Sequence, residues 1–154
     1  MKETTSLHRI ALDERNLPLA LRPGDILFAY RGNAQSRFKA SIFATDSEIP
    51  VIASSTLYII RLETKRVLPE YLVVYFNSDK GQKRFQSLAL GASVRAVSVR
   101  ELKNLSIPIP AKEKQKALIA LWQNMQKQNS ILRRRIQLQE KFVNDFTSIL
   151  TKSH

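Results

Sequence analysis

The stretch from residue 111 to residue 150 contains neither proline nor glycine, and it limits the possible folds of this chain more than any other feature. Its apolar residues recur at alternating steps of four and three, as on a helix that packs against another helix. The stretch therefore predicts one helix of about 40 residues, roughly 60 Å long. The preceding part of the chain, with a radius of gyration near 13 Å, is too small to bury the whole apolar stripe. We expect part of the stripe to meet another helix, in this chain or in a partner.

The residues that recur at these steps of four and three form the predicted contact face of this helix. Two interpretations remain open for its polar members, Asn129 and Gln139: tolerated faults in the stripe, or groups that set the register of a coiled coil. The run from Arg133 to Arg135 covers roughly 200° of the helix surface and is either a solvated face or a contact with a nucleic-acid backbone. The predicted contact face consists of Leu118, Trp122, Met125, Asn129, Leu132, Ile136, Gln139, Val143, Phe146 and Leu150.

The charge of the chain indicates a polyanionic partner. Lys and Arg number 25 against 13 acidic residues, which gives a net charge of +12. Nucleic acid is the first candidate and a membrane surface the second. The absence of cysteine excludes disulfides, thiolate metal sites and a cysteine nucleophile. No signal peptide and no run of 18 apolar residues is recognisable, so we expect a cytoplasmic protein without a membrane partner.

The front half of the chain has the pattern of β-structure. The segment "LRPGDILFAYRG" has a Pro-Gly turn followed by strand formers, which predicts a strand over residues 25–30. Residues 39–44 and 51–62 are predicted as further strands, and residues 105–110 as an edge strand, because proline cannot donate to a central ladder.

Helical signals follow these strands. Pro69 suits the first turn of a helix, and Ser78 with Asp79 can start a second one, so residues 69–89 predict two short helices. Ser98 and Glu101 have the spacing of a capping box, which predicts a single helical turn that ends near Asn104. The fold class is therefore α+β: a mixed α/β domain over residues 1–110, followed by a long coiled-coil-type helix over residues 111–152.

Enzymatic chemistry finds little support in the residues. His8 and His154 are the only histidines, and the four glycines lack the spacing of a phosphate-binding loop, so we expect no cofactor and no histidine metal site. Asp46, Glu63 and Lys65 leave a metal-dependent nuclease open as an alternative. The other interpretation of these three residues is an exposed loop and a charged turn.

Basic and amide side chains gather in three segments, in a pattern that suits DNA contacts. Arg pairs with guanine edges or phosphates, and Asn or Gln pairs with adenine. An ordinary polar surface remains the alternative interpretation. The candidate DNA contacts are Arg31, Asn33, Gln35, Ser36, Arg37 and Lys39 in the first segment, Lys83 and Arg84 for phosphate in the second, and Ser93, Arg95, Ser98 and Arg100 in the third.

Four stretches follow one another along the chain: "LRPGDILFAYRG", "LPEYLVVYFNSDKGQKRF", "LALGASVRAVSVRELKNLSIPIP" and "KEKQKALIALW". In this order they resemble the target recognition domain of type I restriction-modification specificity subunits, and the likeness covers about residues 21–150. The resemblance implies a non-enzymatic domain that reads a short half-site in double-stranded DNA, and a helix that acts as a spacer. It also implies a separate methyltransferase subunit, whose target DNA sequence this protein determines.

This chain departs from the family pattern, because it has one recognition unit where family subunits usually carry two, and its opening segment is short. Two interpretations remain open: a homodimer, joined through residues 111–150, that reads a palindromic bipartite site, or a remnant. A rival function is a regulatory protein that acts through its helix and binds nucleic acid without sequence preference.

Overall fold

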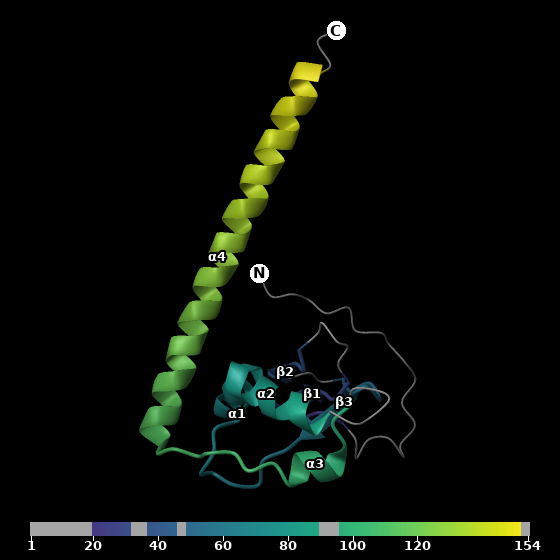
Figure 1. Ribbon diagram of the computed structural model, residues 1–154, viewed down its shortest axis with the longest axis vertical. Coiled ribbons are helices and arrows are strands. Elements are labelled where there is room, and N and C mark those ends of the chain that lie inside the picture. Colours follow the sequence, from purple (N-terminus) through teal and green to yellow (C-terminus); the bar gives the residue numbers. More distant parts are fainter. Residues whose placement is uncertain (1–19, 32–36, 46–48, 90–95, 152–154) are drawn as a thin grey trace. The chain divides into compact units, whose positions relative to one another are not determined.

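The computed structural model describes residues 20–31, 37–45, 49–89 and 96–151. The chain divides into two compact units, Met1–Ile107 and Pro108–His154. Figure 1 shows the sheet and the shorter helices of the first unit, and the long helix of the second unit in green to yellow.

Among the described residues of the first unit, three strands form an antiparallel sheet. They are β1 (Ile26–Ala29), β2 (Ala40–Ile42) and β3 (Leu57–Ile60), in the order β2-β1-β3. Buried and half-buried residues alternate along β1, as the two-residue period of a strand requires. Ile26 and Phe28 therefore point to one face of the sheet, where both are fully buried.

Helices α1 (Pro69–Asn77) and α2 (Asp79–Leu88) supply the other half of the core. Proline occupies the first turn of α1, and the Ser78 hydroxyl caps α2 by accepting a hydrogen bond from the Gly81 N–H. The ring of Phe28 lies 5.6 Å from that of Phe76 in α1 and 4.8 Å from that of Phe85 in α2. This aromatic cluster holds the two helices to the sheet, because each ring buries a large apolar area.

Helix α3 (Val99–Lys103) has the predicted capping box. The Glu101 N–H donates to the Ser98 hydroxyl at 3.2 Å, and the Ser98 N–H donates to the Glu101 carboxylate at 2.8 Å. The helix ends with Asn104 at its C-cap, as the sequence predicts.

The second unit is dominated by α4 (Lys112–Thr151), a single helix of 40 residues. Its observed bounds lie one residue from the predicted ones at each end. The mixed α+β class with a long C-terminal helix is thereby confirmed.

The predicted strands are longer than the observed ones, and one is absent. β3 covers only the last part of the predicted strand over residues 51–62, because a turn at Ser55 and Thr56 separates it from Ile52, which forms an isolated bridge with Ala20. Residues 105–110 form no strand, so that prediction is wrong. Pro108 and Pro110 have no N–H to donate to a ladder.

Candidate nucleic-acid interface

Arg31 lies where two of the predicted DNA-contact segments meet. Its backbone forms an isolated antiparallel bridge with Ala96, and the Val97 N–H donates to the Tyr30 carbonyl at 3.0 Å. Val97 is fully buried, so this connection is anchored in the core, whereas the Arg31 side chain is exposed. The structure therefore brings the start of the first segment next to the third segment, more than 60 residues later in the chain.

Two tyrosines support Arg31 from the sheet. Tyr30 follows β1 and Tyr58 lies in β3, and their rings are stacked with centroids 4.2 Å apart and planes at 8°. Since Tyr58 pairs with Phe28, Tyr30 is its diagonal neighbour on the same face of the sheet. The guanidinium carbon of Arg31 lies 5.4 Å from the centroid of the Tyr30 ring, within the range of a cation–π contact.

The electrostatic surroundings of Tyr58 fit this packing. Burial raises the pKa of the Tyr58 hydroxyl above its ordinary value, and the neighbouring Tyr30 and Glu101 act in the same direction. The positive charge of Arg31 opposes this rise in the pKa of Tyr58, so Arg31 lies within electrostatic reach of the Tyr58 hydroxyl. Sequence reasoning missed Tyr30 and Tyr58 as part of the candidate site, because their meeting depends on the pairing of β1 with β3.

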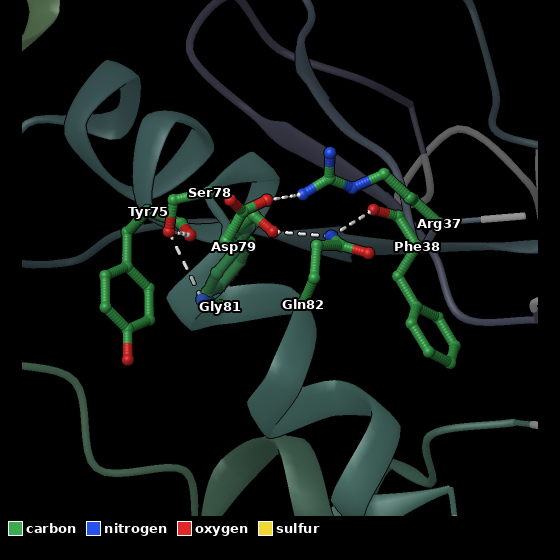
Figure 2. A network of polar contacts seen from close by, with 8 residues as sticks. Arg37, Phe38, Tyr75, Ser78, Asp79, Gly81 and Gln82 are labelled. Atoms are coloured by element: carbon green, nitrogen blue, oxygen red, sulfur yellow. Dashed lines mark hydrogen bonds and ion pairs between the residues drawn. The ribbon is translucent and has the colours of Figure 1, made fainter.

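The other end of the first segment is held by the junction between α1 and α2. Arg37 forms an ion pair with Asp79, the first residue of α2, and both side chains are exposed (Figure 2). The Gln82 side-chain amide, which is buried, donates to the Phe38 carbonyl at 2.7 Å and to the Phe76 carbonyl at 2.7 Å. Arg37 therefore contacts α2 through its side chain, and the next residue, Phe38, contacts it through its backbone carbonyl.

Asn77 extends this connection along β2. The Ala40 N–H donates to the Asn77 Oδ1 at 3.1 Å, and the Asn77 Nδ2 donates to the Ala40 carbonyl at 2.8 Å. The Lys39 carbonyl accepts a hydrogen bond from the Ala29 N–H at the end of β1. Backbone groups alternate in direction along a strand, so those of Phe38 and Ala40 point to the outer edge of the sheet. The amides of Asn77 and Gln82 thus satisfy an edge that would otherwise be open to another strand.

The remaining candidate DNA contacts are distributed over three elements. Lys39, Lys83 and Arg84 are exposed beside β2 and on α2, and Arg100 is exposed on α3. The hydroxyl of Ser98 serves the capping box of α3, which gives this residue a structural role that its sequence also indicates. The predicted contacts that lie outside the described residues are Asn33, Gln35, Ser36, Ser93 and Arg95.

The residues of the nuclease alternative do not form a described metal centre. Glu63 and Lys65 are exposed and follow the end of β3, and Asp46 lies outside the described residues. Among the residues that the structure describes, no group of three His, Cys, Asp or Glu side chains is placed to hold a metal ion. In the same part of the chain, no helix has the length and apolar character needed to span a membrane.

Helix α4 exposes most of its predicted contact face. From Met125 onwards every residue of the helix is exposed, including large apolar side chains that a helix in water ordinarily covers. Trp122 is half-buried. The exposed apolar residues of the seam are Leu118, Met125, Leu132, Ile136, Val143, Phe146 and Leu150.

Comparison with known proteins identifies one family. The family described as "Type I restriction modification DNA specificity domain" matches residues 14–140, which include most of both units. No curated protein matches the chain.

Proposed function

Because the chain belongs to the family of type I restriction modification DNA specificity domains, we propose that it reads one half of a bipartite DNA site and directs a methyltransferase subunit to that site. The family recognises DNA sequence as the specificity component of restriction-modification systems. The proposal has three components: a surface that reads the DNA, the pairing of two copies, and the docking of the methyltransferase. The protein itself supplies recognition, and the methyltransferase subunit supplies catalysis.

The bridge between Arg31 and Ala96 carries the assignment of the reading surface. It joins two basic segments that are far apart in the sequence, so that their side chains can approach one stretch of duplex together. Arg31, which forms the bridge, and Arg100, which follows Ala96 by four residues, are both exposed. Asn33, Gln35, Ser36, Ser93, Arg95 and Ser98 complete the proposed reading surface.

Helix α2 is assigned to the phosphate backbone. Lys83 and Arg84 are both exposed, and a lysine or arginine that meets phosphate fixes the orientation of a protein on the duplex without reading its sequence. Arg37 lies near this helix in the fold, since it is paired with Asp79, the first residue of α2. A phosphate group that approaches Arg37 competes with the carboxylate of Asp79 for the guanidinium group.

The exposed seam of α4 supports a pairing of two copies through this helix. Water-exposed rows of large apolar residues at steps of four and three are most stable when a second helix covers them. A symmetric dimer presents the same surface twice, so two reading surfaces related by a twofold axis recognise a palindromic site with a fixed gap. A helix of 40 residues is roughly 60 Å long and is suited to set that gap.

A second apolar row on α4 supports the docking of a methyltransferase helix. It lies roughly 110° around the helix from the first seam, as calculated from about 100° per residue. A partner that covers the first seam does not cover this second row, which can meet another helix, as in a bundle where each helix meets two neighbours. The row consists of the exposed residues Leu121, Ile131, Leu138, Phe142 and Ile149.

The test of the proposed function is a selection from a pool of randomised duplexes at about 150 mM salt, where attraction to the backbone alone is much weakened. The expected result is a two-part palindromic motif with a fixed gap. A motif with a single half would contradict the pairing of two copies but not the reading of DNA. Recovery without any motif, both for the protein alone and with its methyltransferase, would contradict specific recognition.

Binding without sequence preference is the second candidate function, and the net charge of +12 favours it. The same selection separates the two, because a protein that binds only the backbone retains all sequences equally and loses affinity steeply as salt increases.

A further inference from the structure

The orientation of the Arg31 guanidinium group depends on a neighbouring side chain as well as on the Arg31 backbone. Its side chain is exposed, and a free arginine in such a position populates many rotamers, which costs free energy when it is fixed on a base. A contact that orients the guanidinium group before DNA arrives lowers that cost. The Tyr30 ring, 5.4 Å from the guanidinium carbon, is such a contact.

Tyr30 is itself held in place from three directions. Its ring lies against Tyr58 at 4.2 Å, its hydroxyl donates to the Ser55 carbonyl at 3.2 Å, and its own carbonyl accepts from the Val97 N–H at 3.0 Å. Tyr58 belongs to β3, which pairs with β1 over its whole length. The orientation of the Tyr30 ring is therefore determined by the sheet and by the buried Val97.

We propose that Tyr58 is a positioning residue for DNA reading: it fixes the Tyr30 ring, and that ring orients the guanidinium group of Arg31 towards one base pair of the half-site. This inference rests on the proposed function. It assigns Arg31 to base reading, whereas Lys83 and Arg84 lie on a helix and have no such aromatic support among the described ring contacts.

The orientation of Arg31 in the free protein tests the first step. We expect the Arg31 Nε–H resonance of the full-length wild-type protein to show a ring-current shift. The shift should persist in the Tyr58→Phe variant and disappear in the Tyr58→Leu variant. The same resonance position in all three proteins would overturn the proposal, because the stack would then have no influence on the guanidinium group.

The effect on reading tests the second step. Arg31→Ala is expected to reduce discrimination at one base position by about 5- to 150-fold. Tyr58→Leu is expected to reduce discrimination at the same position by about 3-fold, in line with the strength of an exposed cation–π contact, whereas Tyr58→Phe leaves it unchanged. Because Tyr58 acts through Arg31, adding Tyr58→Leu to Arg31→Ala should cause no further loss.

Ile59→Ala is the matched control. Ile59 is the neighbour of Tyr58 in β3 and points to the opposite face of the sheet, so its truncation weakens the same strand without touching the stack. Thermal unfolding of every variant checks that each one is folded at the temperature of the binding assay.

The outcomes separate this inference from the proposed function. If the wild-type protein selects no motif, the proposed function fails. If the wild type selects a motif and Tyr58→Leu weakens all sequences evenly, or adds to the loss in Arg31→Ala, the tyrosine contacts DNA or supports the fold directly. In that case the positioning role is overturned while the reading of DNA stands.

Discussion

Arg61 binds the carboxylate of Asp25 with two hydrogen bonds, from Nε to Oδ1 at 2.8 Å and from a terminal nitrogen to Oδ2 at 2.7 Å. The residues are 36 positions apart, and the Asp25 side chain is only 2% exposed. The Arg22 N–H also donates to this carboxylate, across the turn at Gly24, which has a φ of 92°. The pair therefore connects the turn before β1 to the residue that follows β3.

Replacing Asp25 with Asn should lower the free energy of unfolding by about 1.5 to 3 kcal/mol, the range for a hydrogen bond to a charged group. The cost stays below that of breaking a fully buried ion pair, because the Arg61 side chain is 38% exposed and can turn to water. Urea unfolding at pH 7 measures the change. Glu63→Gln, at an exposed carboxylate, is the control, with an expected change within about 0.5 kcal/mol.

The same pair predicts a loss of stability in acid. The hydrogen bond from the Arg61 side chain holds the pKa of Asp25 below its ordinary value in the folded protein, although burial opposes this. Since the pKa is lower in the folded than in the unfolded state, the ionised carboxylate stabilises the protein above about pH 4, and this contribution is lost as pH falls through the folded-state pKa. The difference in stability between wild type and Asp25→Asn should therefore narrow from pH 7 to pH 3. A difference that stays constant over this range would contradict the prediction.

Gly81→Ala should destabilise the junction of α1 and α2. A Cβ atom at this position would lie 2.2 Å from the Tyr75 carbonyl oxygen and 3.0 Å from that of Phe76. Both are backbone atoms, so the helices must move apart, at a cost of about 1 to 3 kcal/mol or more. The midpoint of thermal unfolding measures the effect. Ser87→Ala, at an exposed position of the same helix, should leave the midpoint nearly unchanged.

Lys83→Ala should weaken binding to all duplexes by a similar factor. A lysine that contacts phosphate releases counterions on binding, so its removal reduces the slope of log affinity against log salt by about 1. Arg31→Ala should instead reduce the discrimination between bases at one position of the site. Affinities measured for a selected site and its single-base variants, over a series of salt concentrations, distinguish the two effects. An even loss for Arg31→Ala would contradict its assignment to base reading.

Ile136→Lys should separate a dimer formed through α4. Ile136 is 53% exposed and belongs to the predicted seam, where a lysine would place a charge in an apolar contact. Sedimentation of the variant should show the mass of one chain, while wild type shows two. Gln137→Lys adds the same charge one residue further along the helix, outside both apolar rows, and should leave the dimer intact. A wild type that sediments as one chain at every concentration would contradict the pairing.

Helices could be predicted from the sequence because their signals are local. The spacing of apolar residues, the Pro69 start of α1 and the reciprocal bonds of Ser98 and Glu101 all involve residues within one or two turns. Hydrogen bonds in a helix join residues four apart, so a window of the sequence contains both partners. The predicted α4 accordingly differs from Lys112–Thr151 by one residue at each end.

Strands were predicted less well, since their extent depends on partners elsewhere in the chain. The segment over residues 51–62 is rich in strand formers and was predicted as one strand, but only Leu57–Ile60 pair with β1. The run over residues 105–110 is apolar as well, yet its prolines remove donors and leave it without a ladder.

The sequence by itself determined the helical elements, the positive charge and the set of basic residues available for DNA. Only the tertiary structure decided which of them meet. It joined Arg31 to Ala96, paired Arg37 with Asp79 across 42 residues, and stacked Tyr30 on Tyr58. The physical reason is that these contacts depend on the pairing of strands and the burial of the aromatic core, which bring distant residues together at distances that no local pattern encodes.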